Sequence, residues 1–268
     1  MSTERTIVQR SSGHARHGIT RLVSPSDIGE AIKPFVFLDH FSLAAGGPRM
    51  PMHPHSGIAT VTVVLEGSVD YYESTGASGT LAAGGVEWMS AGGGVWHGGG
   101  TSTGVRGFQL WLALPEQDEL SPAHSHYAGP AEVPASGPVR VVLGSYEGAA
   151  SPIRTSAPIN YLHVRLRDGE RWTYVPPAGH DVAWLAVSTG ALVTAGARIG
   201  QEVAVFEDGQ DAIAVVAQGD TEFVLGSAPK HPYPLVTGYY SVHTSQAALE
   251  QGEAGIVGTQ PTRQTVRR

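Results

Sequence analysis

The chain has 268 residues, enough material for one large domain or two modest domains with their own cores. Hydrophobic residues make up 41% of it and charged residues 15%, which excludes a disordered chain, and the lack of cysteine excludes disulfides and thiolate chemistry. The net charge of −7 argues against nucleic-acid binding through a broad basic surface.

Short strands and turns dominate the predicted secondary structure, and the 35 glycines and 18 prolines fit many turns. A first series of strand candidates covers residues 59–67, 68–75, 80–93, 106–115 and 138–148. A second series covers residues 159–169, 170–179, 182–196, 201–209, 211–219 and 221–227. One helix is expected at residues 244–252, with Thr244 or Ser245 as its N-cap and Gly252 as its stop signal.

The two series of strands resemble each other. Residues 61–79 and residues 182–200 each read as an apolar strand, a turn glycine and another strand, with Gly67 opposite Gly190. This weak internal repeat predicts two similar β-domains, sandwiches or small barrels, and two unrelated β-modules are the alternative.

The next elements of the two halves also follow in the same order, with residues 82–93 matching residues 206–219. A linker is expected within residues 132–158, which are rich in Ala, Ser, Gly and Pro.

The sequence predicts no membrane attachment. Its N-terminus lacks the hydrophobic core of a signal peptide, and no apolar run reaches the ~18 residues that a membrane span needs. We therefore expect a cytoplasmic protein whose partners include neither a membrane nor nucleic acid.

Histidines at the start of one strand candidate are the strongest chemical signal. His53 and His55 are two residues apart, so in a strand both imidazoles point to the same face. His97, in a glycine-rich stretch some forty residues later, is the candidate third ligand of a metal site. The plain alternative is a packed or surface histidine pair without metal.

The other histidine pair and the large apolar side chains near His97 are interpreted as structural. His124 and His126 form a second His-X-His pair, which we place in a loop, and Trp88, Met89 and Trp96 are expected to pack the core. The sequence contains none of the patterns GxGxxG before a helix, P-loop, GxSxG or HExxH.

Five stretches of the sequence resemble those of a known family, the pirins. The similar stretches are "FVFLDHF" (35–41), "HPHSGIATVTVVLEG" (53–67), "GGVEWMSAGGGVWH" (84–97), "GFQLWLALP" (107–115) and "YPLVTGYYSVHTSQAALEQG" (233–252). The resemblance implies an all-β bicupin, in which two β-barrel (jelly-roll) domains lie face to face, followed by a short C-terminal helix.

The resemblance also implies a division of the chain. Residues 1–133 would form a cupin domain with the metal site, and residues 134–268 a second cupin domain without ligands, since Pro176 and Ala178 match His53 and His55. The C-terminal segment would pack back on the N-terminal domain.

In pirins the metal, typically iron, is held by three histidines and a glutamate. The histidines carry over to His53, His55 and His97, whereas Gly99 stands at the position of the glutamate and Ala59 at a second acidic position near the site. Three neutral imidazoles still suit Fe, Ni, Cu, Mn, Co or Zn, but without the anionic ligand we expect weaker binding and an additional open position. The candidate general base is lost as well.

Two further residues lie near these segments by family analogy. His40 and Gln109 are expected to support the site rather than to bind the metal.

The resemblance leaves three functions open. The first is a metal-dependent dioxygenase of the quercetin 2,3-dioxygenase type, acting on a flavonol or a related aromatic substrate. The second is a non-catalytic pirin that binds a regulatory protein partner, and the third is a relative without metal. The sequence leaves the oligomeric state open, and we expect a monomer.

Overall fold

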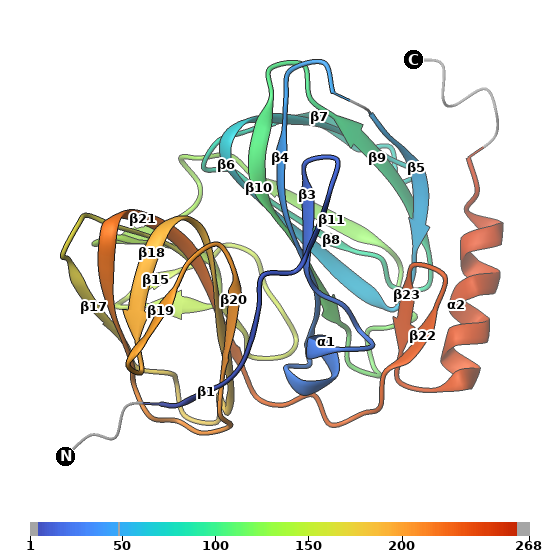
Figure 1. Ribbon diagram of the computed structural model, residues 1–268. Coiled ribbons are helices and arrows are strands. Elements are labelled where there is room, and N and C mark those ends of the chain that lie inside the picture. The colour runs from blue at the N-terminus through green and yellow to red at the C-terminus, as the bar shows by residue number, and fades with distance from the viewer. Residues whose placement is uncertain (1–4, 48, 262–268) are drawn as a thin grey trace.

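The computed structural model, which describes residues 5–47 and 49–261, contains two large antiparallel sheets that each curl into a barrel (Figure 1). The N-terminal barrel is a 10-stranded sheet in the order β11-β8-β6-β10-β4-β3-β2, in which β7 and β9 also pair with β6, and β5 pairs with β9. Its strands are β2 (His14–Arg16), β3 (Ile19–Val23), β4 (Phe35–Leu43), β5 (Met50–His55), β6 (Ile58–Glu73), β7 (Ser78–Ala82), β8 (Val86–Ser90), β9 (Val95–Gly100), β10 (Val105–Ala113) and β11 (His124–Ala128).

The C-terminal barrel is a 9-stranded sheet in the order β1-β20-β18-β21-β16-β13-β12, with β17 on β21 and β19 on β18. Its strands are β1 (Ile7–Ser11), β12 (Ala135–Ser136), β13 (Val139–Leu143), β16 (Asn160–Leu166), β17 (Arg171–Tyr174), β18 (Val182–Thr194), β19 (Ala197–Ile199), β20 (Val203–Phe206) and β21 (Ile213–Ala228). The remaining elements are two ribbons and two helices: β14 (Ser145–Tyr146) with β15 (Ala149–Ala150), β22 (Val236–Gly238) with β23 (Ser241–His243), α1 (Ile28–Ala31) and α2 (Gln246–Gly258).

The strand order confirms part of the internal repeat and corrects the rest. β6 and β18 occupy the same place in their sheets, and Gly67 and Gly190 both have a positive φ within them, +72° and +76°. The matching of residues 82–93 with residues 206–219 is wrong, because β8 pairs with β6 as β20 pairs with β18, whereas β21 takes the place of β10.

The two barrels pack against each other through the outer faces of their sheets. Successive strand residues point to opposite faces, so Ala59, Val61 and Val63 of β6 face the second barrel, where they share a core with Tyr161 and Trp184. The inside of the C-terminal barrel is filled by a separate apolar cluster that includes Leu162, Leu185, Phe206, Phe223 and Leu225.

A buried carboxylate connects the barrels at the edge of this core. Glu222 of β21 accepts hydrogen bonds from His163 and Arg165 of its own barrel and from Nη1 of Arg106 on β10, at 2.8 Å. The same Arg106 nitrogen also donates to the Ser188 hydroxyl, at 2.6 Å. The ionic contact therefore spans the two barrels.

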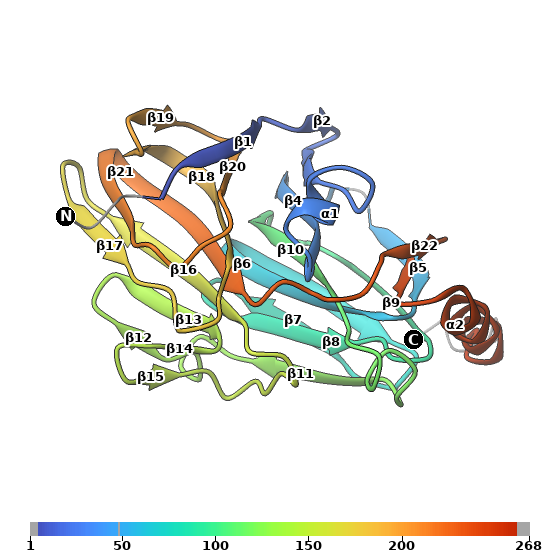
Figure 2. The same cartoon turned by 90° about the horizontal axis from the view of Figure 1, so that it is seen from below.

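Both ends of the described chain cross to the opposite barrel. β1 pairs with β20 in the C-terminal sheet, while the segment after β21 runs back so that β22, β23 and α2 lie on the far side of the N-terminal barrel (Figures 1 and 2). We propose that the two domains divide between residues 133 and 134, except that β1 belongs to the C-terminal barrel and β22, β23 and α2 pack on the N-terminal barrel (Figure 1).

Two sequence predictions about local structure need correction. His124 and His126 do not lie in a loop, because β11 pairs with β8 along its whole length, and both side chains are exposed. Ser245 is the N-cap of α2 as expected, but the helix does not stop at Gly252 and continues to Gly258. Gly252 instead meets a close neighbour, since a Cβ there would lie 2.3 Å from Nε2 of His243.

The described part of the chain has no helix long and apolar enough to cross a membrane.

Candidate metal centre

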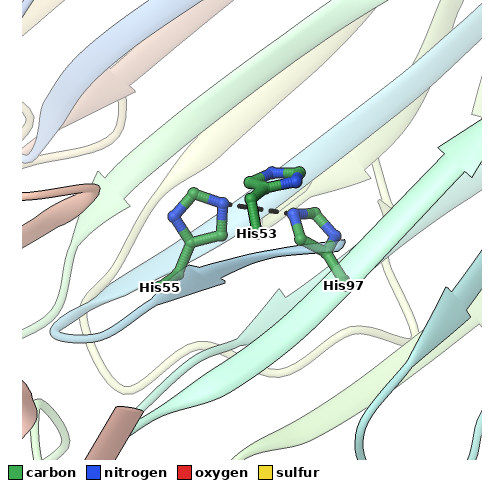
Figure 3. A group of neighbouring side chains, drawn as sticks. All are labelled: His53, His55 and His97. Atoms are coloured by element: carbon green, nitrogen blue, oxygen red, sulfur yellow. Dashed lines mark hydrogen bonds between the residues drawn. The ribbon is translucent and has the colours of Figure 1, made fainter. Parts of the chain in front are cut away.

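The pairing of β5 with β9 brings the three predicted histidines together. His53 lies directly opposite His97 in the register of this pair, and His55 shares the face of His53 because it is two residues further along. One ring nitrogen from each of His53, His55 and His97 lies within 4.8 Å of the others, and Figure 3 shows the rings turned toward one another. Among the described residues, no other cluster of histidines and carboxylates has this geometry.

Backbone carbonyls orient two of the three rings. Nδ1 of His53 lies 2.9 Å from the carbonyl oxygen of Pro51, and Nδ1 of His55 lies 2.9 Å from that of Tyr240. A carbonyl oxygen only accepts, so both Nδ1 atoms carry the hydrogen and both Nε2 atoms keep a lone pair. Metal-binding histidines in proteins are typically held in this way.

Burial keeps the three imidazoles neutral. Desolvation lowers the pKa of His55 to about 3, lowers the pKa of His97 well below its usual value, and lowers the pKa of His53. The neighbouring histidines add to the shift for His55 and His97. Neutral imidazole is the form that binds a metal, so the residues fit a first-row transition metal ion.

Aromatic rings surround the histidines. The edge of Trp111 meets His55 with ring centroids 4.8 Å apart, and Phe37 stacks on Trp111 at 4.0 Å. The ring centroids of Tyr240 and His53 lie 5.7 Å apart, and Tyr240 remains 39% exposed. The site thus has an apolar wall on one side and an accessible aromatic ring at its rim.

A buried carboxylate lies beside His97. Oε1 of Glu87, on β8, is 3.9 Å from Nδ1 of His97, and its Oε2 accepts a hydrogen bond from the Thr62 hydroxyl. Burial and the nearby Glu73 carboxylate raise the pKa of Glu87 to about 7. No local sequence pattern reveals Glu87, because its place beside His97 depends on the pairing of β8 with β6.

Gly99, at the position predicted for the family glutamate, leaves little space for any side chain. A Cβ on it would lie 2.6 Å from the backbone oxygen of Asp70. Ala59 does not lie at the site, contrary to the expectation, because it faces the core between the two barrels, whereas its neighbour Ile58 packs with Trp111.

His40 and Gln109 do not belong to the histidine cluster. Nε2 of His40 contacts the Ser188 hydroxyl of the second barrel at 2.9 Å, and Oε1 of Gln109 lies 2.8 Å from the Thr62 hydroxyl. Gln109 therefore touches the group that holds Glu87, whereas His40 belongs to the barrel interface.

The C-terminal segment supplies contacts that the sequence could not reveal. Ser56, the residue after His55, lies 3.0 Å from Nε2 of His243, and Nδ1 of His243 lies 2.9 Å from Glu119. These three side chains are buried, and α2 covers them through Gly252. We call residues 236–258 the C-terminal clasp.

The clasp also contacts the strand that carries His97. The indole nitrogen of Trp96 donates to the carbonyl of Ile256 at 2.9 Å. Trp96 is thus not only a packing residue, as was expected, but a link between β9 and α2.

Comparisons with known proteins agree with this architecture. The family model described as Pirin matches residues 16–112. A pirin-like protein of Caulobacter vibrioides is 30% identical over 250 residues, covering 87% of this chain and 85% of that protein. The chain belongs to the pirin family. A Pseudomonas aeruginosa protein with a provisional assignment as a quercetin 2,3-dioxygenase is 32% identical over 278 residues, covering 94% of this pirin and 96% of the relative.

Solved structures support the fold assignment. The crystal structure of a quercetin 2,3-dioxygenase from Acinetobacter baumannii superposes with a TM-score of 0.86 at 24% identity, covering 96% of this pirin and 98% of that chain. The nickel(II) complex of the pirin YhhW from Escherichia coli superposes with a TM-score of 0.67 at 22% identity, covering 84% and 98%. The fold of this pirin is therefore the bicupin predicted from the sequence, and its short C-terminal helix is α2.

Proposed function

We propose that this pirin binds a divalent metal ion through Nε2 of His53, His55 and His97 and acts as an oxygenase of the quercetin 2,3-dioxygenase type. The observation that carries the proposal is the convergence of three neutral imidazoles within 4.8 Å. Iron is the resident metal in this proposal. The nickel in the Escherichia coli relative makes nickel the first alternative, followed by copper, manganese, cobalt and zinc.

A bound metal would supply Lewis acidity toward the enolisable oxygens of a flavonol and a route for its electrons to O₂. The protein's own contribution is to bind and orient a flat substrate. Tyr240, exposed at the rim of the site, and Tyr239 beside it, 72% exposed, offer aromatic surface for stacking. Trp111 and Phe37, both buried, make the wall beside His55 apolar.

A second candidate function is binding without catalysis, with a regulatory protein as the partner. The observation that favours it is the absence of a side chain at Gly99, where a carboxylate could have accepted the proton of a substrate hydroxyl. Glu87 does not replace that base directly, because it lies on the Nδ1 side of His97, away from Nε2.

Turnover of quercetin separates the two functions. The protein is purified under metal-defined conditions and loaded in turn with Fe, Ni, Cu, Co or Mn, and the flavonol absorbance is followed in air. We expect its loss with at least one metal, and no loss with His97→Ala. Stoichiometric metal without any turnover would refute the oxygenase and favour the binding protein.

A further inference from the structure

The contact between His55 and His97 determines the tautomers of both rings. Because Nδ1 of His55 donates to the Tyr240 carbonyl, Nε2 of the neutral ring has a lone pair. Nε2 of His97 lies 3.1 Å away from it, so this nitrogen must be the donor of the hydrogen bond (Figure 3). His97 therefore carries its hydrogen on Nε2 in this arrangement.

This tautomer of His97 cannot bind a metal ion through Nε2. The hydrogen must first move to Nδ1, with no net change in the charge of the ring. His53 and His55 already have the required tautomer, because a backbone carbonyl holds each Nδ1 hydrogen. For His97, the acceptor on the Nδ1 side is the carboxylate of Glu87, at 3.9 Å.

Neighbouring strands fix the position of Glu87. In the sheet registers, Thr62 of β6 and Tyr127 of β11 lie on either side of it, and the Thr62 hydroxyl bonds to its Oε2. A hydroxyl has one hydrogen. Because the Thr62 hydroxyl donates it to Glu87, its contact with Gln109 must be one in which Gln109 donates and Thr62 accepts. The amide nitrogen of Gln109 is buried without a partner, and turning this amide would supply that donor.

We propose that Glu87 is a positioning residue that holds His97 in its metal-binding tautomer. The proposal rests on the metal site described under the proposed function. A small rotation of the imidazole or the carboxylate closes the 3.9 Å gap to hydrogen-bond length once Nδ1 carries the hydrogen. Carboxylate–histidine–metal arrangements of this kind typically raise metal affinity roughly 10–100-fold.

Nickel(II) affinity, measured by competition with a chromogenic chelator, tests the proposal in the full-length protein. Glu87→Gln removes the charge but keeps an acceptor, and Glu87→Leu removes both. We expect the dissociation constant to rise about 10-fold and about 100-fold, respectively. Glu87→Asp should restore part of the affinity lost in Glu87→Gln. The matched control is Glu66→Gln, because the Glu66 carboxylate is exposed and contacts Arg106 rather than the histidines or Glu87. It should change affinity less than about threefold.

A spectroscopic readout separates positioning from stability. With zinc(II) bound, ¹H–¹⁵N NMR of the imidazoles should show a His97 Nδ1 hydrogen that is protected from exchange with water in the unaltered protein and exchanges faster in Glu87→Leu. If Glu87→Leu does not fold, Thr62→Val keeps the charge but removes the hydroxyl, and a several-fold weaker affinity is expected. Unchanged affinity in the Glu87 variants, or an equal loss in Glu66→Gln, would overturn the role of Glu87 alone. Failure of the unaltered protein to bind nickel or zinc would overturn the metal site as well.

Discussion

The carbonyl oxygen of Tyr240 accepts a hydrogen bond of 2.9 Å from Nδ1 of His55, across 185 positions of sequence. Tyr240 makes this contact from a left-handed backbone conformation, with φ of +59°. A non-glycine residue in this conformation carries a cost that the surrounding contacts must offset. The C-terminal clasp is thus both a cover over β5 and β9 and the group that sets the tautomer of one ligand.

Loss of the Glu119 carboxylate should loosen the clasp. Glu119 accepts hydrogen bonds from Nδ1 of His243 at 2.9 Å and from the backbone and hydroxyl of Thr244 at 2.8 and 2.6 Å. Glu119→Ala leaves these buried donors without a partner, and we expect a loss of about 2–4 kcal/mol. Urea unfolding measures it, with Glu250→Ala on the exposed face of α2 as a control that should stay within about 0.5 kcal/mol. Equal midpoints for the two variants would contradict the prediction.

A methyl group at Gly252 should also destabilise the protein. A Cβ there would lie 2.3 Å from Nε2 of His243 and 2.6 Å from Oγ of Ser56, and both side chains are buried. We expect Gly252→Ala to cost about 1–3 kcal/mol, although alanine is the better helix former. Gly258→Ala is the matched control, because a Cβ at this helical glycine meets nothing within 4 Å. Thermal unfolding should show a lower midpoint for the first variant and an unchanged or higher midpoint for the second.

Metal stoichiometry should depend on His97. Elemental analysis of protein expressed in supplemented medium should find close to one equivalent of metal in the unaltered protein, and less than about a tenth of an equivalent in His97→Ala, because two imidazoles rarely suffice. His126→Ala removes an exposed histidine on β11 and should retain the metal. Less than a tenth of an equivalent in the unaltered protein would instead identify the third function considered, a pirin without metal.

Acid should weaken the contact between the barrels through Glu222. Burial raises the pKa of this carboxyl, but hydrogen bonds and charge from His163, and bonds from two arginines, outweigh burial and lower it to about 2. The folded-state pKa lies below the unfolded value of about 4.3, so the carboxylate's contribution is complete above pH ~5. It disappears as the pH falls toward 2, and it is on the order of 2–3 kcal/mol.

Urea unfolding at a series of pH values measures this contribution. The unfolding midpoint should fall between pH ~5 and pH ~2, and this fall should be smaller in Glu222→Gln. Glu66→Gln is the control, since Glu66 contacts the same Arg106 from an exposed position, with its side chain 74% exposed. An identical pH profile for Glu222→Gln and the unaltered protein would contradict the assignment.

The sequence was sufficient for the features that depend on local pattern. Alternating apolar residues predicted the strands, and the two-residue spacing of His53 and His55 predicted a shared face, which the pairing of β5 with β9 provides. It could not predict Tyr240 as a partner of His55, because this residue acts through its backbone carbonyl, which every residue has.

Long-range pairing accounts for the errors. The local pattern predicts a helix stop at Gly252, because a glycine at that position usually ends a helix, but its close contact with His243 arises only when the clasp folds back. Glu87 cannot be identified from local pattern, because its proximity to His97 depends on β8 and β9 both pairing with β6.

The return of the clasp to the first barrel has a consequence for the order of synthesis. His53, His55 and His97 leave the ribosome long before residues 236–258, and a chain is made at roughly 5–20 residues per second. During that interval the first barrel can form without the Tyr240 carbonyl, so His55 lacks the contact that sets its tautomer. The histidine site gains this contact only after the second barrel and the clasp have been translated. A nascent chain arrested after the first barrel would contain His53, His55 and His97 but would lack the Tyr240 carbonyl.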